Sequence, residues 1–82
     1  MQELMQIPGI GKEAAKDLMN MGICQLSDLH GTNPEQLYEQ HCTQKGQTVD
    51  RCVLYQFRCA VYFVNNTEHD PEKLKWWNWK DV

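Results

Sequence analysis

The residues whose types and spacing suggest chemistry lie near the start of the chain, in the run IPGIGK from Ile7 to Lys12. Pro8 fixes φ and has no N–H donor, while Gly9 and Gly11 allow backbone conformations that a side chain would forbid. We therefore expect a tight turn that leads directly into a helix. The amides at the positive end of such a helix face outward, where they favour anions such as phosphate.

The expected phosphate ligands are backbone amides and two lysines. A cation in the first helical turn opposes the helix dipole, so Lys12 is a locally unfavourable choice that indicates function, and a bound anion would reverse the penalty. Lys16 follows one turn later. The predicted site comprises Gly9, Ile10, Gly11, Lys12 and Lys16.

This run resembles the helix-hairpin-helix motif of proteins that bind DNA without sequence specificity. The motif has an apolar residue, Pro, Gly, an apolar residue and Gly, followed by Ala and Leu on the second helix. The matching positions are Ile7, Pro8, Gly9, Ile10, Gly11, Ala15 and Leu18. The resemblance implies that glycine amides hold a DNA phosphate, assisted by Lys12. Alternatively, Pro and Gly only form a corner between helices of a SAM-like bundle.

Three later segments, 22–29, 49–60 and 70–81, resemble a small bacterial helix-hairpin-helix family known as pathogenicity-locus proteins. This likeness covers nearly the whole chain. More loosely, the chain is similar to the C-terminal domain of TfoX-type competence regulators. The resemblance implies an all-α DNA-binding fold.

The bulk composition restricts the partners of the chain. Its 82 residues fit one small domain, 1–82, and the formal net charge is −3, whereas dedicated nucleic-acid binders are usually basic. Any anion-binding surface must therefore be local. The start has neither the basic nor the apolar region of a signal peptide, and no apolar run approaches membrane-spanning length. We expect a cytoplasmic protein without membrane contact.

The apolar spacing predicts a compact all-α bundle of about five short helices. After a turn or two before residue 7, the expected helices cover 12–21, 23–29, 34–42 and 49–65, with a last short one from 71 to 75. Asn33 and Thr48 are the expected N-caps of the third and fourth of these helices, and Gly22 is a left-handed stop. Members of the family that the chain resembles often have Ser or Thr where this chain has Gln25, so the usual N-cap is absent and we expect the helix at 23–29 to fray.

The longest predicted helix carries a stripe in which Arg51, Tyr55, Arg58 and Tyr62 are spaced four, three and four apart. One interpretation is a secondary contact with nucleic acid through Arg51, Tyr55 and Arg58. The interpretation that we favour is a floor for the C-terminal tail, because aromatic stripes at helical spacing usually pack.

The tail, 66–82, contains Trp76, Trp77 and Trp79. Each indole can bury about 150 to 250 Å², so that together they contribute on the order of 10 kcal/mol before entropy. We expect at least two to close the core, and truncation after Asp70 to unfold the protein. The alternative is that the tail anchors a partner protein.

No catalytic or metal site is predicted. The candidate metal ligands are His41, Cys42, Cys52 and Cys59, but no pair has the two-residue spacing of a structural zinc site. We interpret the four cysteines as reduced, mostly buried thiols. No nucleophile has a positioned base, so we expect neither an enzyme nor a cofactor.

Two functions remain. The first is weak, non-sequence-specific DNA binding through the hairpin, helped by a protein partner or self-association. The second is a protein-interaction adaptor in which the hairpin serves only as architecture.

Overall fold

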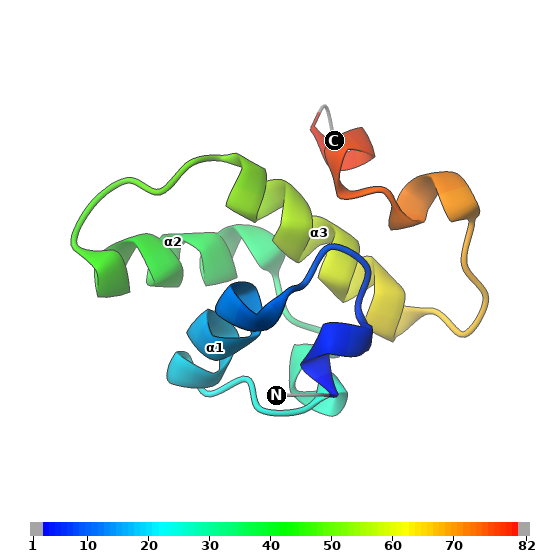
Figure 1. The fold of residues 1–82 in the computed structure, drawn as a ribbon, viewed down its shortest axis with the longest axis horizontal. Helices are drawn as coiled ribbons and strands as arrows, with labels where there is room; N and C mark the ends of the chain where they lie inside the picture. The colour runs from blue at the N-terminus through cyan, green and yellow to red at the C-terminus, as the bar shows by residue number, and fades with distance from the viewer. Residues whose placement is uncertain (1–2, 81–82) are drawn as a thin grey trace.

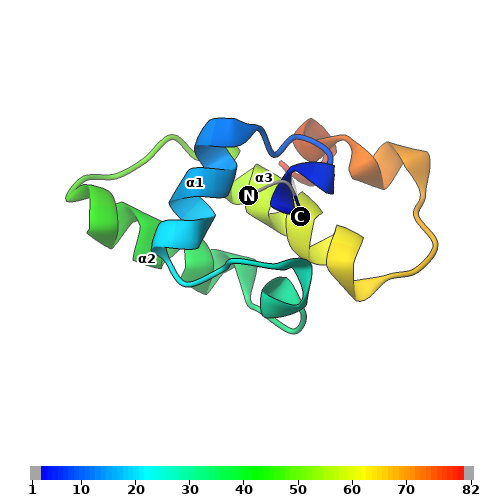
Figure 2. The same cartoon turned by 60° about the horizontal axis from the view of Figure 1, so that its bottom comes forward.

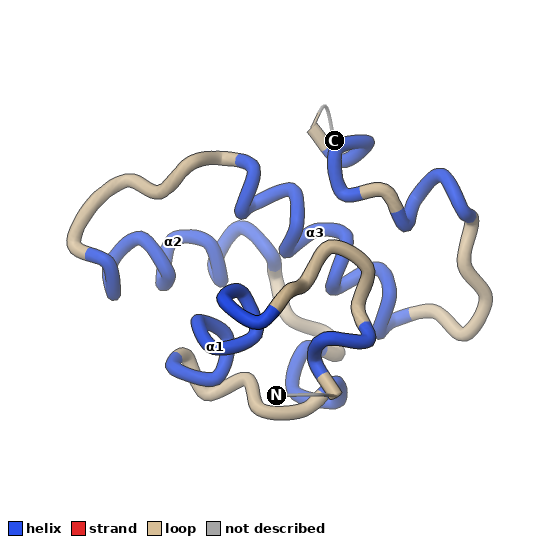
Figure 3. Tube along the Cα trace, viewed as in Figure 1, coloured by secondary structure: helices blue, strands red, loops and turns tan. Residues whose placement is uncertain are grey.

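The longest helix, α3 (Cys52–Asn65), runs through the middle of the molecule, and the other elements pack around it (Figure 1). The computed structural model describes residues 3–80. Helix α2 (Pro34–Lys45) and the short turn η4 (Trp76–Trp79) both pack against α3. The predicted all-α class is confirmed, since the described residues form helices and loops without strands (Figure 3).

The helix count differs from the prediction of about five. Residues 3–80 contain three α-helices and four 3-10 turns. The remaining elements are η1 (Leu4–Gln6), α1 (Lys12–Asn20), η2 (Leu26–Leu29) and η3 (Pro71–Leu74). The segments predicted before residue 7 and at 23–29 are thus single 3-10 turns.

Helix α1 packs through an apolar face that includes the buried Ala15 and Leu18. It ends where Gly22 adopts φ +88°, as the sequence predicts. The Gly22 amide donates to the carbonyl of Met19 (3.1 Å), and the Ile23 amide donates to that of Leu18 (2.9 Å). This pair of hydrogen bonds is a Schellman motif, which satisfies the last carbonyls of the helix.

The turn η2 begins with a capping box formed by Gln25 and Asp28, and Glu3 adds a further cap. The Asp28 carboxylate accepts from the amides of Cys24 (3.0 Å) and Gln25 (3.2 Å). Glu3, from the start of the chain, accepts from the Leu26 amide at 2.7 Å. The prediction that this segment lacks an N-cap is therefore wrong, because Asp28 caps it from within the turn and Glu3 caps it from a distant element.

Helix α2 begins as predicted. Oδ1 of Asn33 accepts from the amides of Glu35 (2.9 Å) and Gln36 (3.3 Å), which is an N-cap interaction. The helix continues to Lys45, one turn beyond the predicted end, and stops where Gly46 adopts φ +70°.

Helix α3 begins at Cys52, three residues later than predicted. The side chain of Asp50 accepts from the Cys52 amide at 3.0 Å. The Val49 amide donates to Sγ of Cys42 on α2 at 3.4 Å. The N-cap residue of α3 is Arg51, whose side chain makes no capping hydrogen bond, and Asp50 is the side chain that bonds the first amide. The prediction that Thr48 caps this helix is therefore wrong.

One continuous core joins the N-terminal elements to α2 and α3. Its buried apolar side chains are Leu4, Ile7, Ile10, Ala15, Leu18, Met21, Leu29, Leu37, Tyr38, Leu54, Phe57, Ala60 and Val61. The radius of gyration is 11.6 Å, which matches the value of about 12 Å for a compact chain of this length. The described residues therefore pack compactly around this core.

The C-terminal tail packs on α3 through η3 and η4. Trp76 and Trp79 are partly buried, whereas Trp77 is 56% exposed. The buried Sγ of Cys59 lies 3.5 Å and 3.4 Å from the carbonyl oxygens of Lys73 and Leu74. The tail thus covers one face of α3 without adding a fully buried tryptophan.

Candidate nucleic-acid interface

The predicted tight turn is present at residues 7–11, which we call the Pro-Gly turn. The Ile10 amide donates to the carbonyl of Ile7 at 3.1 Å, and Gly9 adopts φ +85°. With Pro8 in the second position, these features indicate a type II turn, which requires a positive φ at its third residue. The side chains of Ile7 and Ile10 are buried and anchor the turn in the core.

This geometry corrects the prediction for Ile10. Its amide is a donor within the turn, and its side chain is only 4% exposed. Ile10 is therefore an anchor of the turn rather than a phosphate ligand. Among residues 3–80, the amides of Gly9, Gly11 and Lys12 have no hydrogen-bond partner.

Gly11 is the N-cap of α1, and the fold does not require a glycine there. Its φ of −92° and ψ of −170° are open to any residue. A Cβ atom at this position would meet nothing within 4 Å. Without a side chain, Gly11 leaves the first amides of α1 uncapped and the space in front of them empty.

Both lysines of the predicted site are exposed. Within the described residues, neither Lys12 nor Lys16 forms an ion pair. By contrast, Nζ of Lys45 lies 3.3 Å from the carboxylate of Asp17. Glu13 shares the first turn of α1 and offsets part of the local positive charge. The charge at the turn is therefore weakly positive and available to a ligand.

The C-terminal tail lies directly against the Pro-Gly turn. A Cβ atom at Gly9 would lie 2.9 Å from Cδ1 of Trp76. The Trp76 ring in turn meets the Trp77 ring edge to face, with centroids 5.7 Å apart. In both Figures 1 and 2, η4 lies next to the loop between η1 and α1. The sequence carries no signal for this contact, because the two segments lie at opposite ends of the chain.

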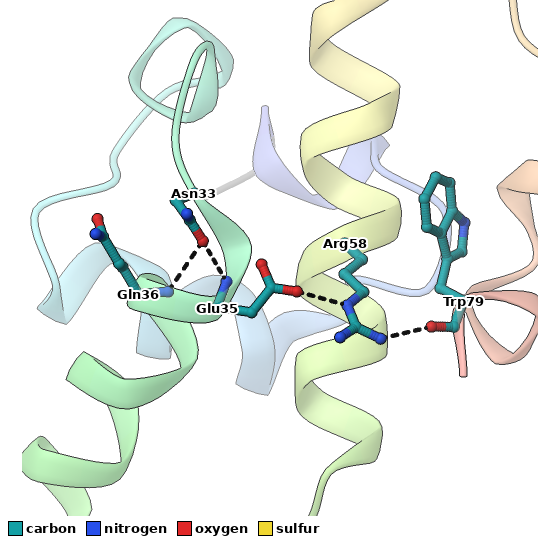
Figure 4. Close-up of polar contacts among 5 residues, drawn as sticks. All are labelled: Asn33, Glu35, Gln36, Arg58 and Trp79. Atoms are coloured by element: carbon teal, nitrogen blue, oxygen red, sulfur yellow. Dashed lines mark hydrogen bonds and ion pairs between the residues drawn. The ribbon is translucent and has the colours of Figure 1, made fainter. Parts of the chain in front are cut away.

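Arg58, a predicted secondary contact, is engaged within the protein. Its Nε lies 2.9 Å from Oε1 of Glu35, and its Nη1 donates to the carbonyl of Trp79 at 2.8 Å (Figure 4). The Arg58 side chain is only 10% exposed. This residue thus joins the start of α2 to the tail, which favours the interpretation of the stripe as a floor.

Of the other stripe residues, Tyr62 and Tyr55 contact neighbouring groups of the protein, whereas Arg51 is exposed. The Tyr62 hydroxyl accepts from the Asp70 amide at 2.9 Å, next to the tail. Tyr55 is partly buried, and Cζ of Arg58 lies 5.8 Å from the centre of its ring. Only Arg51 keeps an exposed charge. A secondary contact with nucleic acid would therefore depend mainly on Arg51.

The structure does not bring the candidate metal ligands together within residues 3–80. Within residues 3–80, no group of three or more His, Cys, Asp or Glu side chains is placed to hold a metal ion. All four cysteines are free thiols, but only Cys59 is buried, which corrects the expectation of mostly buried thiols. Burial raises the pKa of the Cys59 thiol to about 11. This thiol is therefore a poor nucleophile.

His41 is buried between α1 and α3. Its Nε2 lies 3.9 Å from the Asp17 carboxylate, and its ring meets that of Phe57 edge to face. Within the described residues, Nδ1 of His41 has no hydrogen-bond partner. Burial lowers the pKa of His41; Lys45 lowers it further, and Asp17 opposes the shift.

Comparisons with known proteins identify a family. A family model described as pathogenicity locus matches residues 1–82. No curated protein and no solved structure matches the chain. No helix in residues 3–80 has the length and apolar character needed to cross a membrane.

Proposed function

Because this chain belongs to the pathogenicity-locus family, and that description names no activity, we propose a function from its geometry. The protein is a small module that binds DNA weakly through backbone phosphates and does not read the base sequence. In this proposal η1 and α1 are the two helices of a helix-hairpin-helix motif, and the Pro-Gly turn is its hairpin.

The observation that carries the proposal is the glycine at position 11. Asn, Asp and Ser are the best N-caps, because their side chains satisfy the first amides of a helix, and glycine ranks a few tenths of a kcal/mol below them. Gly11 has no side chain to provide this cap, although any residue could adopt its backbone conformation and a Cβ atom would meet nothing within 4 Å. A glycine that the fold does not need, in front of free amides, allows the close approach of an external anion.

The proposed mechanism uses backbone donors supported by two charges. The amides of Gly9, Gly11 and Lys12 donate to an oxygen of a DNA phosphate at the positive end of α1. The ammonium groups of Lys12 and Lys16 attract the phosphate over the short range that salt screening allows. Contacts of this kind fix the position of DNA and carry no sequence information.

The expected affinity is low. Two or three phosphate contacts give a slope of log K against log salt of about −2 to −3. The net charge of −3 repels DNA from the rest of the surface. Useful binding therefore requires a second copy or a larger partner that adds contacts.

The test is the variant Gly11→Asp, assayed by fluorescence anisotropy with a short labelled duplex at low salt. An aspartate N-cap leaves the stability of α1 unchanged or raises it by a few tenths of a kcal/mol. Its carboxylate, however, occupies the amides and repels phosphate. We expect retained thermal stability and lost binding.

The charge contribution is tested with a matched pair, Lys12→Gln and Lys45→Gln. Both variants remove one positive charge, but Lys45 belongs to an ion pair at the far end of α2. We expect weaker binding for Lys12→Gln alone. Wild-type binding by both Gly11→Asp and Lys12→Gln would refute the hairpin as the DNA site.

The second candidate is a protein-interaction adaptor. It is favoured by the net acidity and by the 56% exposure of Trp77, a residue type enriched in binding hot spots. A folded protein that fails to bind any nucleic acid at low salt would favour this candidate.

A further inference from the structure

We propose that the nucleic-acid site prefers unpaired strands, because Trp77 offers a stacking surface beside the Pro-Gly turn. This inference rests on the proposed function and names its substrate class. The ligand is a strand whose phosphate binds at the turn while one of its unpaired bases lies on the Trp77 indole.

Trp77 is unusual among the aromatic residues of the described chain. Its side chain is 56% exposed, and the other exposed large hydrophobic side chains in residues 3–80 are Met5 and Met19. The neighbouring Trp76 and Trp79 are both partly buried. An indole left in water gives up the stabilisation that its burial would provide. The fold thus leaves one indole more than half exposed while two others are partly buried.

Trp77 belongs to a well-anchored element. The η4 turn is held by the hydrogen bond from Arg58 to the Trp79 carbonyl (2.8 Å) and by the bond from Trp79 Nε1 to the carbonyl of Lys73 (2.7 Å). The edge-to-face contact with Trp76 further restricts the Trp77 ring. A surface fixed in this way loses little conformational entropy on stacking.

The position of Trp77 connects it to the phosphate site. Trp76 touches Gly9 on one side and Trp77 on the other, so that a single indole separates the exposed ring from the turn. The turn presents free amides, and Lys12 adds a charge that has no ion-pair partner within residues 3–80. Donors and positive charge beside an aromatic face match a ligand that combines an anion with a planar ring, as a nucleotide does.

This arrangement discriminates between strand types. In a duplex the base faces are stacked on one another and are not available to an external indole. In a single strand every base has a free π-face, and stacking on a protein aromatic residue is independent of sequence. The Trp77 surface therefore adds affinity for unpaired strands alone, whereas the turn binds phosphates of either form.

The experiment compares a labelled single strand of mixed, non-self-complementary sequence with a blunt duplex of the same length, by anisotropy at low salt. We expect Trp77→Ala to weaken single-strand binding about tenfold and to leave duplex binding unchanged. Trp77→Phe keeps an aromatic face and should retain most of the affinity. Met19→Ala, which removes another exposed apolar side chain from α1, is the control and should change neither.

The outcomes separate this inference from the proposed function. If Trp77→Ala weakens the binding of both strand types equally, or of neither, the proposal that a base stacks on Trp77 is refuted. A loss of duplex binding in Lys12→Gln then still supports the turn as a phosphate site. If wild-type protein binds neither strand type, both proposals fail. Circular dichroism of each variant confirms that the fold is intact.

Discussion

At the scale of single residues, Gly9 has two separate reasons to be glycine. Its φ is +85°, and a Cβ atom would lie 2.9 Å from Cδ1 of Trp76. Gly22 has nearly the same φ, +88°, with nothing within 4 Å of its Cβ position. Alanine substitutions at these two glycines therefore distinguish the cost of backbone strain, present at both, from the cost of displacing Trp76, present only at Gly9.

We expect Gly22→Ala to lower the free energy of unfolding by about 1 to 2 kcal/mol, the cost of a left-handed conformation. Gly9→Ala should cost clearly more, because the Trp76 ring must also move. Urea unfolding of both variants measures the difference. Equal losses would show that Trp76 does not pack against Gly9 in solution.

His41 makes the stability depend on pH. Burial lowers its folded-state pKa below the unfolded value of about 6.5, so the unfolded chain binds more protons between these two values. The contribution of His41 is therefore fully present above pH 6.5 and is lost as the pH falls toward the lowered pKa. The titratable groups facing it are Asp17 and Glu13 on α1 and Lys45 on α2.

We expect the wild-type protein to lose stability between pH 7.5 and pH 5.5, and the variant His41→Leu to lose less. Urea unfolding at the two pH values gives the comparison. An identical loss in both proteins would assign the acid sensitivity to other groups.

At the scale of elements, Arg58 connects α2, α3 and the tail. Its bond to the Trp79 carbonyl joins a charged donor to a partly buried acceptor, and such bonds contribute about 1.5 to 3 kcal/mol. The ion pair with Glu35 contributes less, because that carboxylate is 51% exposed. Loss of Arg58 should therefore loosen the tail more than it loosens α2.

Alkylation of Cys59 reports on the docking of the tail, because the carbonyls of Lys73 and Leu74 cover this thiol. We expect Arg58→Met to accelerate alkylation of Cys59, as measured by peptide mass spectrometry. Arg51→Met, which removes an exposed arginine from the start of the same stripe, is the matched control. An unchanged rate in Arg58→Met would mean that Arg58 does not hold the tail.

The tail also supports the whole fold. A chain that ends at Asp70 lacks η3 and η4, and with them the cover over α3 and the support behind Gly9. We expect this chain to be unfolded or to melt far below the full-length protein. Thermal unfolding followed by circular dichroism compares the Tm of the shortened and full-length chains, and an unchanged Tm would contradict the prediction.

The sequence predicted those elements that are determined locally. The cap at Asn33, the stop at Gly22 and the Pro-Gly turn all depend on residues within a few positions of one another. The start of α3 was predicted wrongly, because Val49 is held by Cys42 of another helix.

The positions in the candidate site that depend on local sequence were predicted, whereas its long-range contacts were not. Gly9, Gly11 and Lys12 lie where their spacing indicates, but the use of the Ile10 amide within the turn was not foreseen. The contact of Trp76 with Gly9 joins the two ends of the chain, and the cap from Glu3 to η2 spans separate elements. Long-range contacts of this kind have no periodic or compositional signal in a single sequence.

At the scale of the whole molecule, charge sets the conditions for any DNA binding. With a net charge of −3, the protein as a whole repels a polyanion, whereas the Pro-Gly turn places amides without a hydrogen-bond partner within residues 3–80 beside two exposed lysines. Attraction is therefore local and short-range, since salt screens exposed charges beyond about 10 Å at 0.1 M. Binding should be detectable at low salt and should fade as salt is added.

The most direct test of this account is an amide NMR titration with a short duplex of random sequence at low salt, repeated at high salt. We expect the amides of Gly9, Gly11 and Lys12 to shift together, and the shifts to disappear at high salt and in Gly11→Asp. If these amides do not move while the protein remains folded, the Pro-Gly turn is not a phosphate site.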